Sequence, residues 1–220
     1  MFLGLDLGHF ENLTDFSDLA DLVFDFDPDH GSGQLKNGEK ILEWPLLGVE
    51  GPRLYSENKD APIWVENIVN SLPVIRFSGN TMLKSESEIV HRKQSYTIFS
   101  ISRYSGERRG RVISSQDKNW LFGFHSGSAN SLFCGEWKNE GELDHGEGWK
   151  INSGIFDTHN LEYQFWDSDN LISKGDLVFD DKYSWIGRVT LGGWKKVEFD
   201  SLIADLNHYH FCHMYQESYL

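Results

Sequence analysis

The sequence predicts an all-β, antiparallel two-sheet sandwich with a short N-terminal arm. From residue 22 onward, short segments rich in β-branched and aromatic residues recur at the regular spacing typical of a sandwich. Most of the 21 glycines lie between these segments, where turns require them. No long helical period follows residue 20. The segments that we expect to form strands are residues 22–26, 72–77, 96–101, 111–114, 120–124, 161–166, 177–179 and 185–189.

Residues 1–20 differ from the rest of the chain because they are acidic and carry only scattered apolar side chains. Phe10, Leu13, Phe16 and Leu19 follow one another at intervals of three, which fits one short amphipathic helix. We expect an N-terminal arm that packs on the main body. The body, residues 21–220, shows no break in composition and no internal repeat, so we expect it to form one domain.

The segment 96–101 shows how the strands are expected to lie. The apolar residues are Tyr96, Ile98, Phe99 and Ile101, and the polar ones are Ser95, Thr97, Ser100 and Ser102. Such alternation predicts a strand with one face on the core and the other in water.

The net charge of the chain indicates which classes of binding partner to expect. There are 34 acidic and 20 basic residues, which gives a formal net charge of −14. This field repels phosphate backbones and anionic lipid, so we expect no nucleic-acid binding and no electrostatic docking on membranes. No apolar run is long enough for a transmembrane helix, so we expect no membrane insertion.

Cysteine usage and the N-terminus leave the compartment open. Cys134 and Cys212 allow either one disulfide bridge or two buried thiols. Residues 1–6 lack the basic and apolar regions of a signal peptide. An extracellular surface and a virion both remain open as locations.

The order of the segments resembles that of a known family. An apolar strand ending in Asp, within residues 22–28, precedes a short strand ending in Trp, within residues 38–44. A Pro-led segment, residues 61–65, precedes an Asn-x-x-Pro-x-x-Arg-Phe-x-Gly strand, residues 70–79, in which Ser71 stands where the family has Gly. In this order of motifs the chain resembles the LamG-like jelly-roll domains of the concanavalin A-like lectin and glucanase superfamily.

The resemblance implies a concanavalin A-like jelly roll over residues 21–220 and a lectin-like, non-catalytic role. LamG-like modules bind carbohydrate, act in adhesion, form non-catalytic parts of enzymes and occur in virion structural proteins, so the fold alone does not fix the function. Our leading hypothesis is a recognition or assembly module with a glycan or protein partner, within a larger structure or adhesion system. A purely structural subunit of a particle such as a virion is an alternative.

An enzymatic alternative rests on the acidic string Glu142, Asp144 and Glu147. By resemblance to the glucanase branch, Glu142 would be the nucleophile and Glu147 the acid/base of a retaining glycoside hydrolase. The string lies among Gly and Asn residues, a composition typical of a loop, and loop carboxylates are poorly fixed for chemistry. We therefore favour a solvated acidic hairpin and no catalytic residues.

Two patterns raise the question of a metal. Asp25, Asp27 and Asp29 alternate as acids do in calcium loops, but Lys36 occupies the position of the usual bidentate Glu. In a strand, His208 and His210 of the C-terminal histidine cluster would share a face and permit a zinc pair, without an evident third ligand. We expect no cofactor, with calcium at the three Asp residues as the alternative.

Aromatic and basic side chains supply the candidate ligand-binding residues. Sugar rings stack their C–H faces on exposed indoles, and guanidinium groups bind carboxylate or sulfate. An arginine hairpin can equally stabilise an acidic body through ion pairs, and most Trp residues of a sandwich lie in its core. The candidates are Trp137, Trp149, Trp166, Trp194, Arg108 and Arg109.

Overall fold

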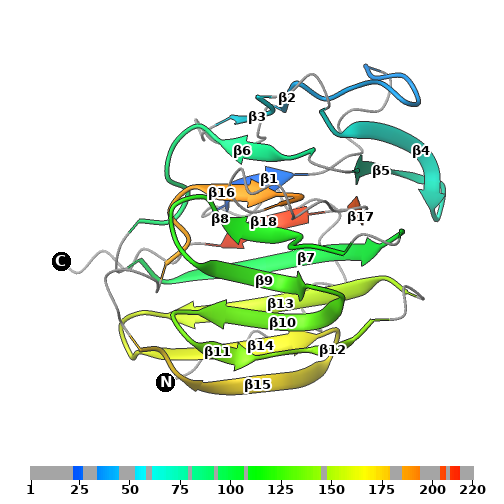
Figure 1. Ribbon diagram of the computed structural model, residues 1–220. Coiled ribbons are helices and arrows are strands. Elements are labelled where there is room, and N and C mark those ends of the chain that lie inside the picture. Colours follow the sequence, from blue (N-terminus) through cyan, green and yellow to red (C-terminus); the bar gives the residue numbers. More distant parts are fainter. Residues whose placement is uncertain are drawn as a thin grey trace.

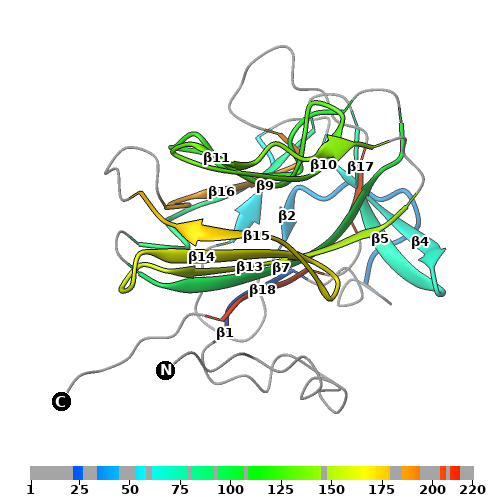
Figure 2. The ribbon, with the colours of Figure 1, turned by 90° about the horizontal axis from the view of Figure 1, so that it is seen from below.

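The computed structural model describes residues 22–26, 34–44, 53–57, 61–78, 81–91, 94–106, 109–144, 148–178, 185–193, 204–206 and 209–213. Among these residues there is no helix, and every strand ladder is antiparallel. The strands form two facing layers (Figure 2). The structure thus confirms the predicted all-β antiparallel sandwich. The predicted arm, residues 1–20, lies outside the described residues.

The first layer is a nine-stranded sheet (Figure 1). Most of its strands are short. Eight strands follow one another in hydrogen-bonded order, and the ninth, β12 (Glu142–Leu143), pairs with β10 (Ser128–Cys134) outside that order. The order runs β11 (Trp137–Asn139), β10, β9 (Trp120–His125), β8 (Ile113–Ser115), β16 (Val189–Leu191), β6 (Leu83–Ser85), β3 (Leu54–Tyr55) and β2 (Glu43–Trp44).

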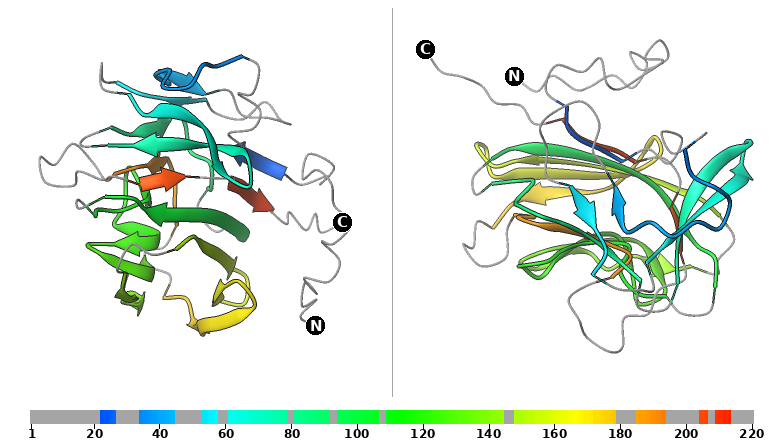
Figure 3. Two further views of the ribbon diagram at one scale, coloured as in Figure 1. Left: turned by 90° about the vertical axis from the view of Figure 1, so that its right-hand side faces the viewer. Right: turned by 90° about the horizontal axis from the view of Figure 1, so that it is seen from above.

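The second layer is a seven-stranded sheet. Its order is β15 (Asn170–Asp176), β14 (Glu162–Asp167), β13 (Lys150–Asp157), β7 (Tyr96–Tyr104), β17 (Ala204–Leu206), β5 (Leu72–Phe77) and β4 (Ile63–Val69). A two-stranded pair, β1 (Leu22–Phe26) and β18 (Tyr209–His213), lies beside β7. Figures 1 and 3 show β18 in line with β17, so the pair extends this layer.

A two-residue turn explains how β9 leads into β10. Ser126 and Gly127 have φ values of 48° and 93°. Two successive positive φ values are the geometry of a type I′ turn, whose twist matches that of antiparallel strands. The turn sets the register in which His125 lies opposite Ser128.

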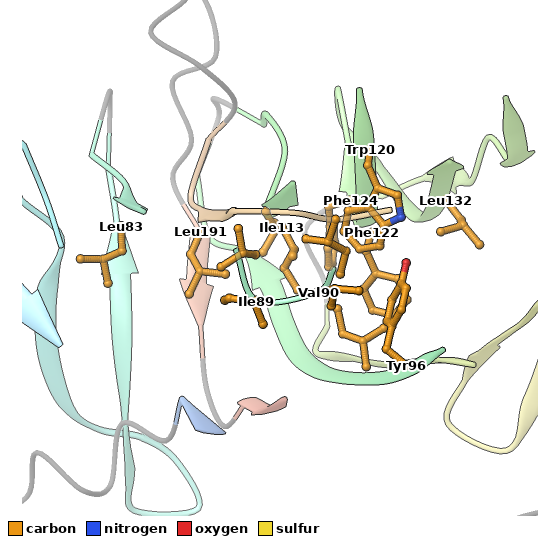
Figure 4. Close-up of a cluster of buried hydrophobic side chains, with 14 of the residues drawn as sticks. Leu83, Ile89, Val90, Tyr96, Ile113, Trp120, Phe122, Phe124, Leu132 and Leu191 are labelled. Atoms are coloured by element: carbon orange, nitrogen blue, oxygen red, sulfur yellow. The ribbon is translucent and has the colours of Figure 1, made fainter. Parts of the chain in front are cut away.

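The core lies between the two layers and is built largely from aromatic rings. Figure 4 shows side chains of this cluster, including Trp120, Phe122 and Tyr96. Phe122 of β9 meets Phe165 of β14 edge to face, with ring centroids 5.2 Å apart. Phe156 of β13 stacks on Tyr96, with centroids 4.5 Å apart. The first contact joins the two sheets directly, whereas the second lies within the seven-stranded sheet.

Strand β7 differs in one respect from the expected alternation. Ser100 and Ser102 are buried on the same side as Tyr96 and Ile98, whereas Ile101 is only partly buried on the opposite side. The sheet register decides this, because β7 lies between β13 and β17 and must place every second residue inward. Apolar character therefore did not identify the inward face along the whole strand.

The search of the described residues for membrane spans found no helix long and apolar enough to cross a bilayer.

Candidate functional site

The outer face of the hairpin β9–β10 carries side chains that lie outside the core cluster between the sheets, although Leu121 among them is fully buried. Directly opposed residues of antiparallel strands share a face. Phe122 and Leu132 are opposed and fully buried on the inner face. The residues next to them therefore face outward, and they form one row across Leu121, Phe133 and Trp137.

A second outward row lies nearer the turn of the same hairpin. His125, Ser128 and Leu143 are opposed across β9, β10 and β12. Leu143 is 69% exposed. Only Gly123 and Ser131 are paired between the two rows on this face, and both carry little or no side chain. The space above them can therefore hold a larger ring from a neighbouring strand.

Trp137 occupies this position. Its indole lies edge to face against Phe133 and against His125, with ring centroids 5.2 Å apart in both pairs. It remains 40% exposed. We call His125, Phe133 and Trp137 the aromatic platform. The platform fixes an indole at the surface with part of its area open to solvent.

The strand that carries Trp137 is fixed by a bulge in β10. Asn130 lies at the irregularity between Ala129 and Ser131 and has a φ of 58°. Its carbonyl oxygen accepts a hydrogen bond from Asn139 Nδ2 at 2.6 Å. Ser131 Oγ donates to the carbonyl oxygen of Glu140 at 2.9 Å. Both bonds hold the segment that follows Trp137 against β10.

The same asparagine ties the platform strand to the opposite sheet. Asn152 of β13, which is fully buried, donates from Nδ2 to Asn130 Oδ1 at 2.8 Å. Asn130 Nδ2 donates to Asp167 Oδ2 at 3.0 Å, and Lys150 Nζ reaches the same oxygen at 3.1 Å. A buried polar group is costly unless it is bonded, so this chain of bonds favours one arrangement of the bulge.

The acidic string does not form a pair of facing carboxylates among the described residues. Glu142 lies in the two-residue strand β12 rather than in a loop, and it is opposed to Ala129 of the inner row. Its exposed carboxylate therefore points away from the face that carries the platform. Asp144 Oδ2 is buried and has no hydrogen-bond partner among the described residues. Glu147 lies outside them.

Four arginines lie close together in the sequence, at positions 103, 108, 109 and 111, and the three that the structure describes make contacts within the sandwich. Arg109 donates from Nε to the carbonyl oxygen of Gly106 at 3.2 Å and from Nη1 to the carbonyl oxygen of Asp144. Arg103 lies over the ring of Trp149, 4.7 Å from its centroid. Arg111 is buried and donates to Asn119 at 2.9 Å. These contacts are with backbone carbonyl oxygens, an indole ring and an amide. Arg108 lies outside the described residues.

The candidate tryptophans do not gather at one place. Trp166 of β14 faces outward from the seven-stranded sheet, in a row with Phe99, Ser153 and Leu171. It is partly buried and lies on the opposite outer face from Trp137. Trp194 lies outside the described residues. Trp137 is thus the candidate with the largest described exposed area.

The metal patterns fall largely outside the described residues. Asp25 lies in β1 opposite His210 of β18, while Asp27, Asp29 and His208 are not described. The described ranges hold no group of three His, Cys, Asp or Glu residues that could bind a metal.

Cys134 is a free thiol in β10. Burial raises the pKa of this thiol to about 12. A thiol that keeps its proton at neutral pH is a poor nucleophile and a poor metal ligand. Cys134 therefore acts as part of the hydrophobic core.

Comparisons with known proteins agree with the fold. No protein-family model matches the chain, and no curated protein matches it. Solved structures match at low identity. Domain 4 of AbnA, a GH43 extracellular arabinanase from Geobacillus stearothermophilus, solved in complex with arabinotriose, has a TM-score of 0.51 and 13% identity, over 88% of this chain and 94% of that domain.

Two toxin binding domains also match. That of Paraclostridial Mosquitocidal Protein 1 has a TM-score of 0.59 and 11% identity, over 94% of this chain and 51% of that one. That of Botulinum Neurotoxin DC, in complex with SialylT, has a TM-score of 0.54 and 10% identity, over 90% of this chain and 48% of that one. The chain thus spans about half the length of these toxin domains. At such identities the likeness shows a shared β-sandwich fold and nothing beyond it.

Proposed function

We propose that this chain is a non-catalytic glycan-recognition module of the LamG-like group, and that the aromatic platform is its binding site. The observation that carries the proposal is the exposed indole of Trp137, held between His125 and Phe133 on the outside of a sheet.

The chemistry of sugars fits this surface. One face of a pyranose or furanose ring carries C–H groups and stacks on the flat, electron-rich face of an indole. The surrounding hydroxyl groups need hydrogen-bond partners at the rim of the aromatic surface. Ser126 Oγ and His125 Nε2 lie 3.2 Å apart at the turn beside the platform, and both atoms can bond to hydroxyl groups.

The fold neighbours support the same ligand class. One was solved in complex with arabinotriose and another with SialylT, and several are described as binding domains. Because their identity to this chain is so low, they support the proposal through the fold and do not name the sugar.

The hydrolase alternative receives no comparable support. A retaining hydrolase needs two carboxyl groups roughly 5 Å apart across a bound sugar. Glu142 points to the other side of β12 from the platform, so a sugar that stacks on Trp137 would not meet it.

Binding on a glycan array tests the proposal, with the intact chain compared with its Trp137→Ala variant. We expect the wild type to bind a restricted set of oligosaccharides, and the variant to lose about 1–3 kcal/mol of binding free energy, the usual cost of removing an aromatic anchor. The control is Trp166→Ala, which removes a partly buried indole from the opposite outer face and should leave binding unchanged. A wild type that binds no glycan, or a Trp137→Ala variant that binds as well as wild type, would contradict the proposal.

A further inference from the structure

We propose that the aromatic platform selects uncharged glycans and discriminates against sialylated or uronic ones. This inference rests on the proposed function and adds the class of sugar that the site accepts. It follows from where the charged side chains around Trp137 point and from what they contact.

Lys138 is the cation next to Trp137 in sequence, and it is turned away from the platform. Its side chain is 5% exposed. Nζ bonds to Glu136 Oε1 at 2.7 Å and to the carbonyl oxygen of Asp176 at 2.5 Å, and it lies 5.1 Å from the ring centroid of Tyr163. This ammonium group already has its partners inside the edge of the sandwich, so it cannot pair with the carboxylate of a sugar on Trp137.

Arg109 is linked through Asp144 to the turn of the β9–β10 hairpin, and its guanidinium group is also engaged. It bonds to the carbonyl oxygens of Gly106 and Asp144, and it lies 5.7 Å from the ring centroid of Tyr104. Asp144 in turn donates its backbone N–H to Gly127 at 2.8 Å. Arg109 thus anchors a loop to the turn. Pairing with a sugar carboxylate would require breaking this anchor.

The exposed charges on the segments that carry the platform are acidic. Glu136 precedes Trp137 and Glu140 follows it, and both are exposed. The chain as a whole carries a net charge of −14. A carboxylate brought to Trp137 therefore enters a negative field, whereas a neutral sugar does not.

The polar groups at the rim are of the kind that hydroxyl groups use. Ser126 is exposed, and its hydroxyl lies 3.2 Å from the ring of His125. A hydroxyl group both donates and accepts, so it matches the hydroxyl groups of a neutral sugar. The platform thus combines a stacking surface with a hydroxyl group and an imidazole ring that can form hydrogen bonds.

The test compares matched pairs of oligosaccharides on the full-length chain. Lactose is paired with sialyllactose, and xylotriose with its glucuronic-acid derivative, after an array of such pairs has identified a neutral sugar that binds. We expect the neutral member to bind at least about tenfold more tightly at low ionic strength, and the gap to narrow in high salt because screening weakens the repulsion. Trp137→Ala should weaken both members of a pair.

Two charge variants sharpen the test. Glu140→Lys should raise the affinity for the acidic member and leave the neutral member within about twofold of wild type. Arg108→Gln serves as the opposing control, since a site that used this side chain to hold an acidic sugar would lose that sugar on substitution. Circular dichroism of each variant checks that it remains folded.

The outcomes separate this inference from the function on which it rests. A Trp137-dependent preference for neutral sugars supports both. Equal binding of the two members, or a preference for the acidic member that Arg108→Gln removes, overturns the selectivity and leaves glycan recognition standing. Binding of neither class to any member of the array overturns both.

Discussion

Trp137 and Lys138 are consecutive residues of β11 with opposite surroundings. The indole is 40% exposed on the outer face, whereas the side chain of Lys138 is 5% exposed. Successive residues of a strand point to opposite faces, so one of the two had to turn inward. The lysine can do so because its long apolar stem packs inside while Nζ finds Glu136, a backbone carbonyl and the ring of Tyr163.

Arg188 and Asp117 form an ion pair that several side-chain hydrogen bonds hold together. Arg188 Nε contacts both carboxylate oxygens, at 3.2 and 3.0 Å, and Nη2 contacts Oδ1. The side-chain hydrogen bonds from Arg188 are the largest influence on the Asp117 carboxyl group and hold its pKa below the ordinary value of 3.8. A bidentate pair of this kind is among the stronger surface ion pairs.

Arg188→Gln should therefore lower the free energy of unfolding by about 0.5–1 kcal/mol near neutral pH, a value reduced for partial exposure of the pair. A lowered pKa in the folded state gives stability that is present above the ordinary carboxyl pKa and is lost as the pH falls through the lowered value. The difference between wild type and variant should accordingly hold at neutral pH and shrink below the ordinary pKa of 3.8.

Urea unfolding of both chains over a pH series measures this difference. Arg53→Gln is the matched control, because Arg53 pairs with Glu43 at 2.6 Å but both side chains are more than half exposed, at 68% and 54%. We expect no measurable change for the control. A difference between wild type and Arg188→Gln that stays constant through the acid range would show that the carboxylate charge is not its source.

At the scale of elements, the connection between β11 and β12 depends on one glycine. Gly141 has a φ of 84°, and a Cβ atom built on it would overlap the carbonyl oxygen of Ala129 and lie 2.5 Å from Ser131 Oγ. Only a residue without a side chain lets the segment come this close to the bulge in β10. Because Trp137 lies on the same edge, this close approach also sets the position of the platform.

Gly141→Ala should lower the free energy of unfolding by about 2–4 kcal/mol, because the overlap with backbone adds to the cost of the positive φ. Gly38→Ala is the matched control. Gly38 has a nearly identical φ of 83°, but a Cβ atom built there has nothing within 4 Å, so only the conformational cost of about 1 kcal/mol applies. Urea unfolding of the two variants measures both values. Equal losses would mean that Gly141 does not approach β10 as closely as the structure has it.

The elements that the sequence could predict are those whose own residues carry the signal. Segments 22–26, 72–77 and 120–124 lie within β1, β5 and β9 because each is a dense run of β-branched and aromatic residues. Strands of two or three residues, such as β8 and β16, form only through their neighbours, so the predicted segments 111–114 and 185–189 overlap them at Ile113–Ser114 and Val189 alone. The predicted segment 177–179 lies just beyond β15, which ends at Asp176.

The residues of the candidate site also fall into two groups, those that the sequence alone can suggest and those that only the structure brings together. The sequence offers Trp137 only as one of six candidate ligand-binding residues, because exposed indoles stack on sugar rings. His125 and Phe133 are not among the six, because their contact with Trp137 depends on the register of β9, β10 and β11. That register depends in turn on the bulge at Asn130, a residue whose buried bonds to Asn152 and Asp167 come from the opposite sheet. No local pattern carries this information.

At the scale of the whole molecule, β14 shows how one strand serves the core and the surface at once. Phe165 is fully buried and meets Phe122 of the opposite sheet, with ring centroids 5.2 Å apart. Trp166 follows it and points to the outside of the sandwich, opposite Ser153. Both residues are aromatic. Phe165 belongs to the core and Trp166 to the surface only because successive residues of β14 point to opposite sides of the sheet.

Phe165→Ala should lower the free energy of unfolding by about 3–5 kcal/mol, because it removes a ring that joins the two sheets and leaves a cavity between them. Trp166→Ala removes a larger side chain, yet it should cost no more than about 1–2 kcal/mol because its surroundings are partly solvent. Guanidinium unfolding followed by both fluorescence and circular dichroism compares the two variants. If removal of Trp166 proved as costly as removal of Phe165, the two faces of β14 would have to be exchanged. Trp137 and Trp166 would then no longer lie on opposite outer faces, and Trp166→Ala would lose its value as a control for glycan binding.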